Sequence, residues 1–527
     1  MGKKRNIPPK TRLDEILLDM AFWVLLAQLL GTAIYFTGKF SNPQAHKELI
    51  AQFCAALAVG LWFLAQAVCG KIRLRLSAYY VPLLLLIVWS AVRTATSVTP
   101  LSTRKWILVA QVVAALPVWV DLMESPRRRL LLSWGVFLIG CIMAGGALIE
   151  SFGYYPHPLI SQYHRQSIGS FVGHNNPMAA FLLMASIHAI GLLVRFRHQR
   201  WCAVFWVYLA INLYLFILSG SRGAWLSFPF AMAVLFLSFH GLRRVQMDPL
   251  LARRIALSVI VCVCAGVVAV GAYTALKGDS EVPSVVDRIR DLGNTFSGTY
   301  PRVWTMSTLM LADRYVSGVG FAAWPQQYPY YQGRWFSEHP DTQLGLPGIW
   351  QHTQRSHSDY LQLAAELGLI GLLLLIWLLL IHIREAWKFI TAKTRSIAAA
   401  VGLTAMTGVL AHALVYFPFH AADSACPFLV NWSLFIAARG RRDKIIEFSG
   451  PLVRWIAIVA ALFFLFVATR PVGKNVTADV LTGQTSYELP RGTKTFYGWN
   501  MKAGALCWTN WAEKYKEDGD PNTAILA

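Results

Sequence analysis

The sequence predicts an all-α polytopic membrane protein with about 12 or 13 transmembrane helices and one long extramembrane loop. Of its 527 residues, 56% are hydrophobic and 14% are charged, and the mean hydropathy is +0.46. Soluble domains carry about 25% charged residues, so the composition excludes an ordinary cytosolic enzyme. Apolar runs recur along the chain, and basic residues gather after every second run. These two patterns predict the spans and their orientation.

Each expected span is an apolar run of about 20 residues, the length that crosses a bilayer. The runs begin near Ile16, Leu49, Tyr80, Trp106, Leu130, Pro177, Trp201, Ala224, Ile255, Leu363, Ile397, Ala421 and Leu452. The first run follows a basic start without a small-residue cleavage site, which favours a retained span over a signal peptide. The runs near Ala421 and Leu452 are the least clear of these, so we expect 12 or 13 spans.

Basic clusters follow the even-numbered runs. They are Lys71, Arg73 and Arg75; Arg127, Arg128 and Arg129; Arg195, Arg197 and Arg200; Arg243, Arg244, Arg253 and Arg254; Arg384, Lys388, Lys393 and Arg395; and Arg439, Arg441, Arg442 and Lys444. By the positive-inside rule these ends and the N-terminus are cytoplasmic. The net charge of +21 then reflects cytoplasmic loops near anionic lipids, and we expect no nucleic-acid partner.

The chain divides into a membrane domain over 1–470 and a polar tail over 471–527, which a thirteenth span would leave on the non-cytoplasmic side. Three non-cytoplasmic loops stand out, at 151–176, 219–224 and about 277–362. Loops longer than about 15 residues are usually functional. The polar motifs lie in these loops, and the chain has no internal repeat of the kind that transporters show.

The first motif, from Arg355 to Gly368, precedes and enters a long apolar run. Ser356 and Asp359 have the spacing of a capping box, which predicts that His357 lies in the first helical turn. The positive end of the helix dipole favours a neutral imidazole that can accept a proton. Glu366 follows near the run, where a carboxylate is usually functional. The alternatives are a loop histidine and an interfacial acid.

The second motif is the short turn from Leu218 to Trp225. Gly220 and Gly223 allow the backbone to reverse, and Arg222 is held at headgroup depth, where a guanidinium can grip a phosphate with two hydrogen bonds. An arginine that contacts lipid phosphate is the alternative.

Two further motifs contribute candidate residues. The segment 163–180 holds Arg165 and His174 before Asn176, and its Asn-Asn-Pro sequence also indicates a turn and a helix start. The segment 300–304 holds Arg302. Histidines in the long loop lack cysteines or carboxylates at ligand spacing, so we expect no metal and no cofactor.

Together these motifs resemble the O-antigen ligase/polymerase superfamily of bacterial envelope glycosyltransferases. The matching series runs from Gly169 to Gly371 and contains Asn176-Pro177, Ser221-Arg222-Gly223, Arg302 with Trp304, Gly318-Val319-Gly320, and His357-x-x-Tyr360-Leu361 with Glu366-x-Gly368. The family often has Asn after the histidine, where this chain has Ser358.

The resemblance implies a lipid-dependent (GT-C-like) glycosyltransferase architecture in the bacterial inner membrane, acting without a metal at the periplasmic face. The donor is a glycan on undecaprenyl pyrophosphate, and in the ligase branch the acceptor is a sugar hydroxyl of the lipid A–core. The family's essential residues fall on Arg222, Arg302 and His357. Arg165, His174, Asn176 and Glu366 are candidates for substrate binding.

An O-antigen ligase is therefore the expected function. An O-antigen polymerase and a protein O-oligosaccharyltransferase would use the same donor, and only the acceptor separates the three. A lipid or glycan transporter is the alternative from another class. A transporter should carry repeats and charged residues near the bilayer midplane, whereas these motifs lie at one face.

Overall fold

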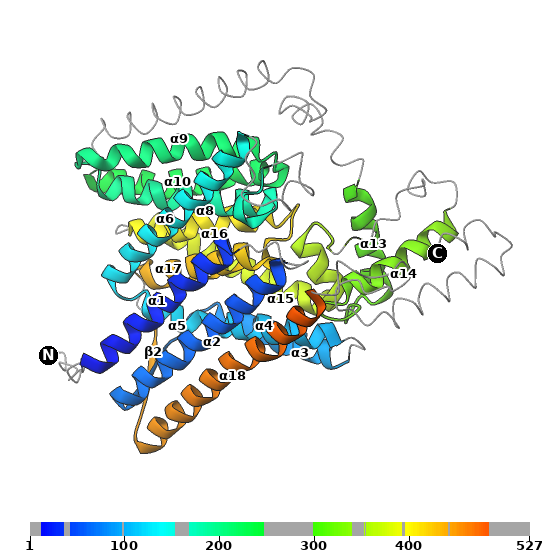
Figure 1. Cartoon of the computed structure of the whole chain (residues 1–527), viewed down its shortest axis with the longest axis horizontal. Helices are drawn as coiled ribbons and strands as arrows, with labels where there is room; N and C mark the ends of the chain where they lie inside the picture. Colours follow the sequence, from blue (N-terminus) through cyan, green and yellow to red (C-terminus); the bar gives the residue numbers. More distant parts are fainter. Residues whose placement is uncertain are drawn as a thin grey trace, which may run out of the picture.

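The computed structural model describes residues 12–35, 43–96, 100–152, 168–246, 299–339, 353, 355–392, 396–440 and 443–483. Helices dominate this part of the chain and pack side by side in a bundle (Figure 1). Within the described residues, nine helical segments are long and apolar enough to cross a membrane, and three apolar helices are shorter. The fold is therefore the multi-span helical membrane fold that the sequence predicts.

The long segments coincide with predicted runs. They are α1 (Arg12–Ile34), α2 (Pro43–Cys69), α4 (Pro100–Ala114) joined to α5 (Leu116–Leu122), α6 (Pro126–Ser151), α8 (Asn175–Arg195), α9 (Ala203–Leu218), α10 (Arg222–Gln246), α15 (Asp359–Thr391) and α18 (Pro451–Gly483). The shorter ones are α3 (Tyr80–Ala95), α16 (Ile397–His412) and α17 (Ala422–Ala438). The predicted run near Ile255 lies outside the described residues. The predicted tail begins inside α18.

The long predicted loop contains two helices of its own, α13 (Thr299–Asp313) and α14 (Trp324–Glu338). In Figure 1 they lie to the right of the bundle, beside α15. Their apolar faces close on the start of α15 in a separate small core that includes Val303, Tyr328 and Ala365. This core holds the segment with Arg302 against the segment with Glu366.

Backbone hydrogen bonds attach the α13–α14 connection to an interruption in α15. The helix breaks at Gly368, whose φ is +66° and ψ is −163°. The N–H groups of Val319 and Gly320 donate to the carbonyls of Ala365 and Glu366 at 2.9 and 3.0 Å. A Cβ at Gly318 would lie 2.4 Å from the carbonyl oxygen of Glu366, so this close approach requires glycine.

A short antiparallel sheet, absent from the sequence prediction, joins the ends of two distant spans. Strand β1 (Lys71–Arg75) pairs with β2 (Ile445–Ser449), and Lys71 lies opposite Ser449. Arg75 extends the contact to Glu124, with 2.6 Å between Nη2 and Oε1. The segments after α2, α5 and α17 therefore gather at one end of the bundle, as the alternation of the spans predicts.

A fully buried ion pair joins the start of α2 to the start of α17. The Nζ atom of Lys47 lies 3.3 Å from Oδ2 of Asp423, and both side chains are fully enclosed. Gln44 donates a further hydrogen bond to the same oxygen at 3.0 Å. A buried charge requires such partners, so the pair fixes how these two helices sit against each other.

Candidate functional site

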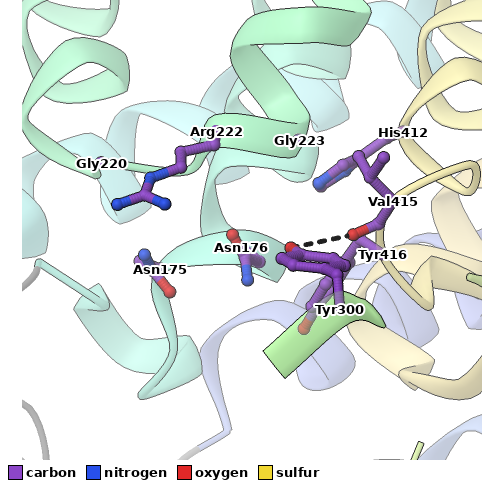
Figure 2. A pocket seen from close by; sticks show the side chains of 9 residues that line it. All are labelled: Asn175, Asn176, Gly220, Arg222, Gly223, Tyr300, His412, Val415 and Tyr416. Atoms are coloured by element: carbon purple, nitrogen blue, oxygen red, sulfur yellow. Dashed lines mark hydrogen bonds between the residues drawn. The ribbon is translucent and has the colours of Figure 1, made fainter. Parts of the chain in front are cut away.

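A pocket of about 200 Å³ lies where α8, α10 and α13 begin. The described residues that line it are Asn175, Asn176, Gly220, Arg222, Gly223, Tyr300, His412, Val415 and Tyr416 (Figure 2). They come from four separate stretches of the chain, and three of these stretches carry motifs that the sequence singles out. The pocket exceeds the roughly 30 Å³ that one water occupies in the liquid, so it has room for a small polyatomic ion.

The start of α8 forms the pocket wall beneath Arg222. His174 caps the helix, because its Nδ1 accepts the N–H of Asn176 at 3.3 Å. Asn175 donates from Nδ2 to the carbonyl of Ser219 at 2.9 Å, and Asn176 accepts from the hydroxyl of Ser221 at 2.6 Å. The predicted helix start is therefore confirmed, and it is tied directly to the turn that carries Arg222.

Arg222 is the first residue of α10, on the predicted tight turn. Gly220 has φ +62°, a left-handed conformation that glycine adopts without steric cost. Gly223 lets the turn approach the 412–415 segment, because a Cβ there would lie 2.9 Å from both His412 Cδ2 and Val415 Cγ2. In Figure 2 the Arg222 guanidinium lies on the same side of the pocket as Asn175. The turn therefore presents a positive charge to the pocket.

Tyr300 is a pocket residue that the sequence analysis did not single out, although it belongs to the quoted 300–304 motif. It is the second residue of α13, and its hydroxyl donates to the carbonyl of Val415 at 3.2 Å. Burial raises the pKa of Tyr300, while the nearby Arg222 guanidinium opposes that rise. The phenol therefore stays neutral beside the charge of Arg222.

His357 is not among the described residues that line the pocket, but its ring contacts Tyr300, which does line it. The two rings meet edge-on with 5.5 Å between centroids, and Phe417 contacts the imidazole from another side at 5.4 Å. Burial lowers the pKa of His357, because a low-dielectric environment disfavours the charged ring. The neutral imidazole expected from the sequence thus has a physical cause, which is aromatic enclosure.

The predicted capping box at Ser356 is wrong. Helix α15 begins at Asp359, and Ser358 is its N-cap, with its hydroxyl accepting the N–H of Leu361 at 3.4 Å. His357 therefore precedes the helix, with φ +55°. The carboxylate of Asp359 bonds His420 and the N–H of Phe419 instead of reaching back to Ser356. A tertiary contact 60 residues away has displaced the local motif.

Arg302 lies outside the residues that line the pocket. It is buried on α13, with 6% of its surface exposed. Its guanidinium lies next to the phenol of Tyr328 on α14, as does Thr353. Burial raises the pKa of Tyr328, and the charge of Arg302 opposes the rise. Arg302 is thus held between α13 and α14, two residues after Tyr300.

Glu366 is also outside the pocket, buried where the 318–324 segment meets α15. Its Oε2 accepts the N–H of Ala322 at 2.8 Å, and its Oε1 accepts the N–H of Trp324 at 3.4 Å. Gln362 donates to Oε1 at 2.9 Å and contacts Nε2 of His420 at 3.2 Å. Both oxygens of Glu366 are therefore occupied in holding the fold together.

The segment 412–417, which begins at the last residue of α16 and leads toward α17, completes the site and was missed by sequence reasoning. Its carbonyls at Ala413 and Tyr416 both accept the N–H of Asp359, at 3.0 and 3.1 Å. Tyr416 stacks on Phe417 at 4.1 Å and on His174 at 6.2 Å. The available signal was the aromatic and histidine content of this short connection.

Two further predictions, that Arg165 belongs to the site and that the site holds no metal, are not tested by the pocket. Arg165 lies outside the described residues. Among the residues that the structure describes, no three His, Cys, Asp or Glu side chains form a group that could hold a metal ion.

Comparison with known proteins gives one family. The O-antigen ligase family model matches residues 207–376, a stretch that includes Arg222, Arg302, His357 and Glu366. No curated protein matches the chain. The pocket residues at 175–176 and 412–416 lie outside the matched stretch. This match bears out the resemblance drawn from the motifs, because residues 207–376 match the model of the O-antigen ligase family.

Proposed function

We propose that the chain is an O-antigen ligase. In this proposal it transfers a glycan from undecaprenyl pyrophosphate to a sugar hydroxyl of the lipid A–core, in the bacterial inner membrane. The observation that carries the proposal is the pocket where three helices begin around Arg222. Of the nine described residues that line it, none is acidic. A metal-free site for a pyrophosphate leaving group needs positive charge and no acidic side chains around the phosphates.

Helix N-termini attract anions because each carries a partial positive charge of about half an elementary charge. Asn175, Arg222 and Tyr300 are each the first or second residue of their helices. Arg222 adds a full charge and a planar fork that can donate two hydrogen bonds to phosphate. The combined field favours the doubly charged pyrophosphate over a neutral ligand.

The reaction assigns separate roles to the charged and the neutral groups. The acceptor hydroxyl attacks the anomeric carbon, His357 takes its proton, and the bond from that carbon to the phosphate oxygen breaks. The electron pair leaves with undecaprenyl pyrophosphate, whose charge Arg222 stabilises. A single displacement of this kind inverts the anomeric centre. The enclosed neutral imidazole of His357 suits a general base.

The remaining candidate residues surround these groups. Arg302, buried two residues after Tyr300, adds positive potential at the same helix start. His174 and Asn176 shape the wall under Arg222, and Asn176 keeps its amide at the pocket. We assign Glu366 to positioning rather than to substrate binding, because backbone N–H groups and Gln362 occupy its oxygens. Arg165 stays a candidate for donor binding.

The orientation belongs to the same proposal. The basic ends at β1 and β2 face the cytoplasm by the positive-inside rule, together with the N-terminus. The pocket belongs to the opposite loops and faces the periplasm, where the donor glycan is displayed. Membrane lipids surround the bundle, and the transfer needs no metal.

The test is the envelope of a deletion strain. We expect loss of all long-chain lipopolysaccharide, accumulation of lipid-linked polymer, and restoration by the wild-type gene but not by Arg222→Gln. Arg195→Gln, at the opposite end of α8 from the pocket, is the matched control and should restore long-chain lipopolysaccharide. Lipopolysaccharide with a single repeat unit would identify a polymerase. Intact lipopolysaccharide with loss of protein glycans would identify a protein O-oligosaccharyltransferase.

A further inference from the structure

His412 is a buried polar residue on the pocket wall that the proposed reaction does not use. It is the last residue of α16, and 1% of its surface is exposed. The imidazole lies flat against Tyr416, with 5.0 Å between centroids and 19° between planes. In Figure 2 it points from α16 toward the start of α10, across the pocket from Asn175.

The two ring nitrogens of His412, Nδ1 and Nε2, lack hydrogen-bond partners among the described residues. Two other buried histidines differ, because His188 pairs with Asn431 at 2.9 Å and His382 with Thr407 at 3.3 Å. Buried polar groups are nearly always satisfied, and leaving one without a partner is costly. A polar ligand in the pocket would supply the missing partner.

The position of the ring identifies the kind of ligand. A Cβ at Gly223 would lie 3.0 Å from Nε2 of His412, so this ring edge faces the first turn of α10. Arg222 is the residue before Gly223 and lines the same pocket. The Arg222 guanidinium lies on the side of the pocket opposite His412 (Figure 2), so a group bound between them could contact both. Such a group is an anion with oxygen acceptors.

We propose that His412 is a further donor-binding residue, which donates a hydrogen bond from its imidazole to a phosphate oxygen of the bound pyrophosphate. The inference rests on the proposed function, since it assumes that this pocket holds the pyrophosphate. His412 belongs to α16, beyond the 207–376 stretch, so the anion site draws on a helix outside the matched domain. Tyr416 keeps the ring in place by stacking.

The experiment measures binding without transfer. The full chain, purified in detergent, is titrated calorimetrically with farnesyl pyrophosphate, a soluble polyprenyl pyrophosphate that carries no sugar. His412→Phe keeps a stacked ring and removes both nitrogens. We expect its Kd to rise about 10- to 100-fold, the effect of losing a hydrogen bond to a charged group. His412→Gln keeps a donor near Nε2 and should bind within about threefold of wild type, a change of at most about 0.65 kcal/mol.

The controls separate this inference from the proposed function. His382→Phe removes a buried imidazole that does not line the pocket and should bind as wild type does. His412→Met, which also lacks a donor, repeats the test if the phenylalanine variant does not fold. Wild-type affinity in His412→Phe, or equal weakening in the Gln and Phe variants, overturns the role of His412. If Arg222→Gln abolishes binding in that case, the anion site stands without it. Absence of wild-type binding overturns both proposals.

Discussion

The ring of Tyr300 lies edge-on to the imidazole of His357, with 5.5 Å between their centroids and 67° between their planes. Tyr300 also lines the pocket that holds Arg222. One phenol therefore separates the proposed proton acceptor from the proposed leaving-group site. Together with Phe417, this contact encloses the imidazole in aromatic surface beside the pocket.

The enclosure of His357 predicts an unusual pH profile. Burial lowers its pKa below the ordinary value of 6.5, so the base stays neutral at pH values where an exposed histidine is half protonated. We expect kcat/KM to be flat around pH 6.5 and to fall only as the pH drops through the lowered pKa. Residual activity of His357→Gln should lack this acid limb. A limb centred above pH 6.5 would contradict the assignment.

The geometry of the guanidinium predicts that Arg222→Lys is impaired although the charge is kept. Lysine cannot make the two parallel hydrogen bonds of arginine. Loss of one charge-assisted contact to the departing pyrophosphate costs roughly 2–4 kcal/mol of barrier, or about 30- to 1,000-fold in kcat/KM. Arg195→Lys, on the same helix bundle but at the other end of α8, is the control and should turn over normally. Near-parental turnover by Arg222→Lys would show that charge alone suffices.

The contacts of Glu366 predict a loss of stability on substitution. Three donors converge on its carboxylate, from Ala322, Trp324 and Gln362. In Glu366→Gln, an NH₂ group replaces one carboxylate oxygen and faces one of these three donors, so a hydrogen bond is lost. The free energy of unfolding should fall by about 1–3 kcal/mol. An SDS titration of the purified protein measures the change. Glu338→Gln, which removes an exposed pair with Arg334 at 2.9 Å, should cost at most about 0.5 kcal/mol.

The orientation predicts opposite labelling of two exposed serines. Ser337, on α14, belongs to the segment assigned to the periplasm, and Ser449, on β2, belongs to the basic end. With the native cysteines replaced, Ser337→Cys should react with an impermeant maleimide in cells whose outer membrane is permeabilised. Ser449→Cys should react only after lysis of the inner membrane. The reverse pattern would invert the topology and move the pocket to the cytoplasm.

Chelation tests the proposal of a metal-free reaction. EDTA should leave the transfer rate of the purified enzyme unchanged, because the proposal assigns stabilisation of the leaving group to Arg222 and the helix N-termini. The rate is measured with a lipid-linked glycan donor in detergent before and after dialysis against the chelator. Activity that is lost and then restored by magnesium or manganese would rule the proposal out.

Local signals were enough to predict the apolar helices that the structure describes, together with the turn and the helix start that line the pocket. The apolar runs fixed the helices by length and composition, and the Asn-Asn-Pro sequence marked the start of α8, where His174 caps it. Gly220 and Gly223 marked the turn at Arg222. Each of these features depends on neighbours within a few residues, so a single sequence carries them.

The features that were missed depend on contacts between distant residues. Asp359 bonds His420 and Phe419, and this contact overrides the capping box expected at Ser356. His412 lies in an apolar run and reaches the pocket only because α16 packs on α10, with Gly223 against its ring. The β1–β2 pairing joins residues 374 apart, as between Arg73 and Glu447. No local pattern encodes such partners.

The buried pair of Lys47 and Asp423 sets an order of events during biosynthesis. Lys47 emerges from the ribosome 376 residues before its partner, so at about 5–20 residues per second it waits roughly 20 to 75 s for Asp423. Meanwhile its ammonium group stays at the headgroups on its extended stem, because an unpaired charge within the bilayer is costly. We therefore expect helix α2 to reach its final depth in the membrane only after α17 has been inserted, and a chain that stops before Asp423 should not complete this step.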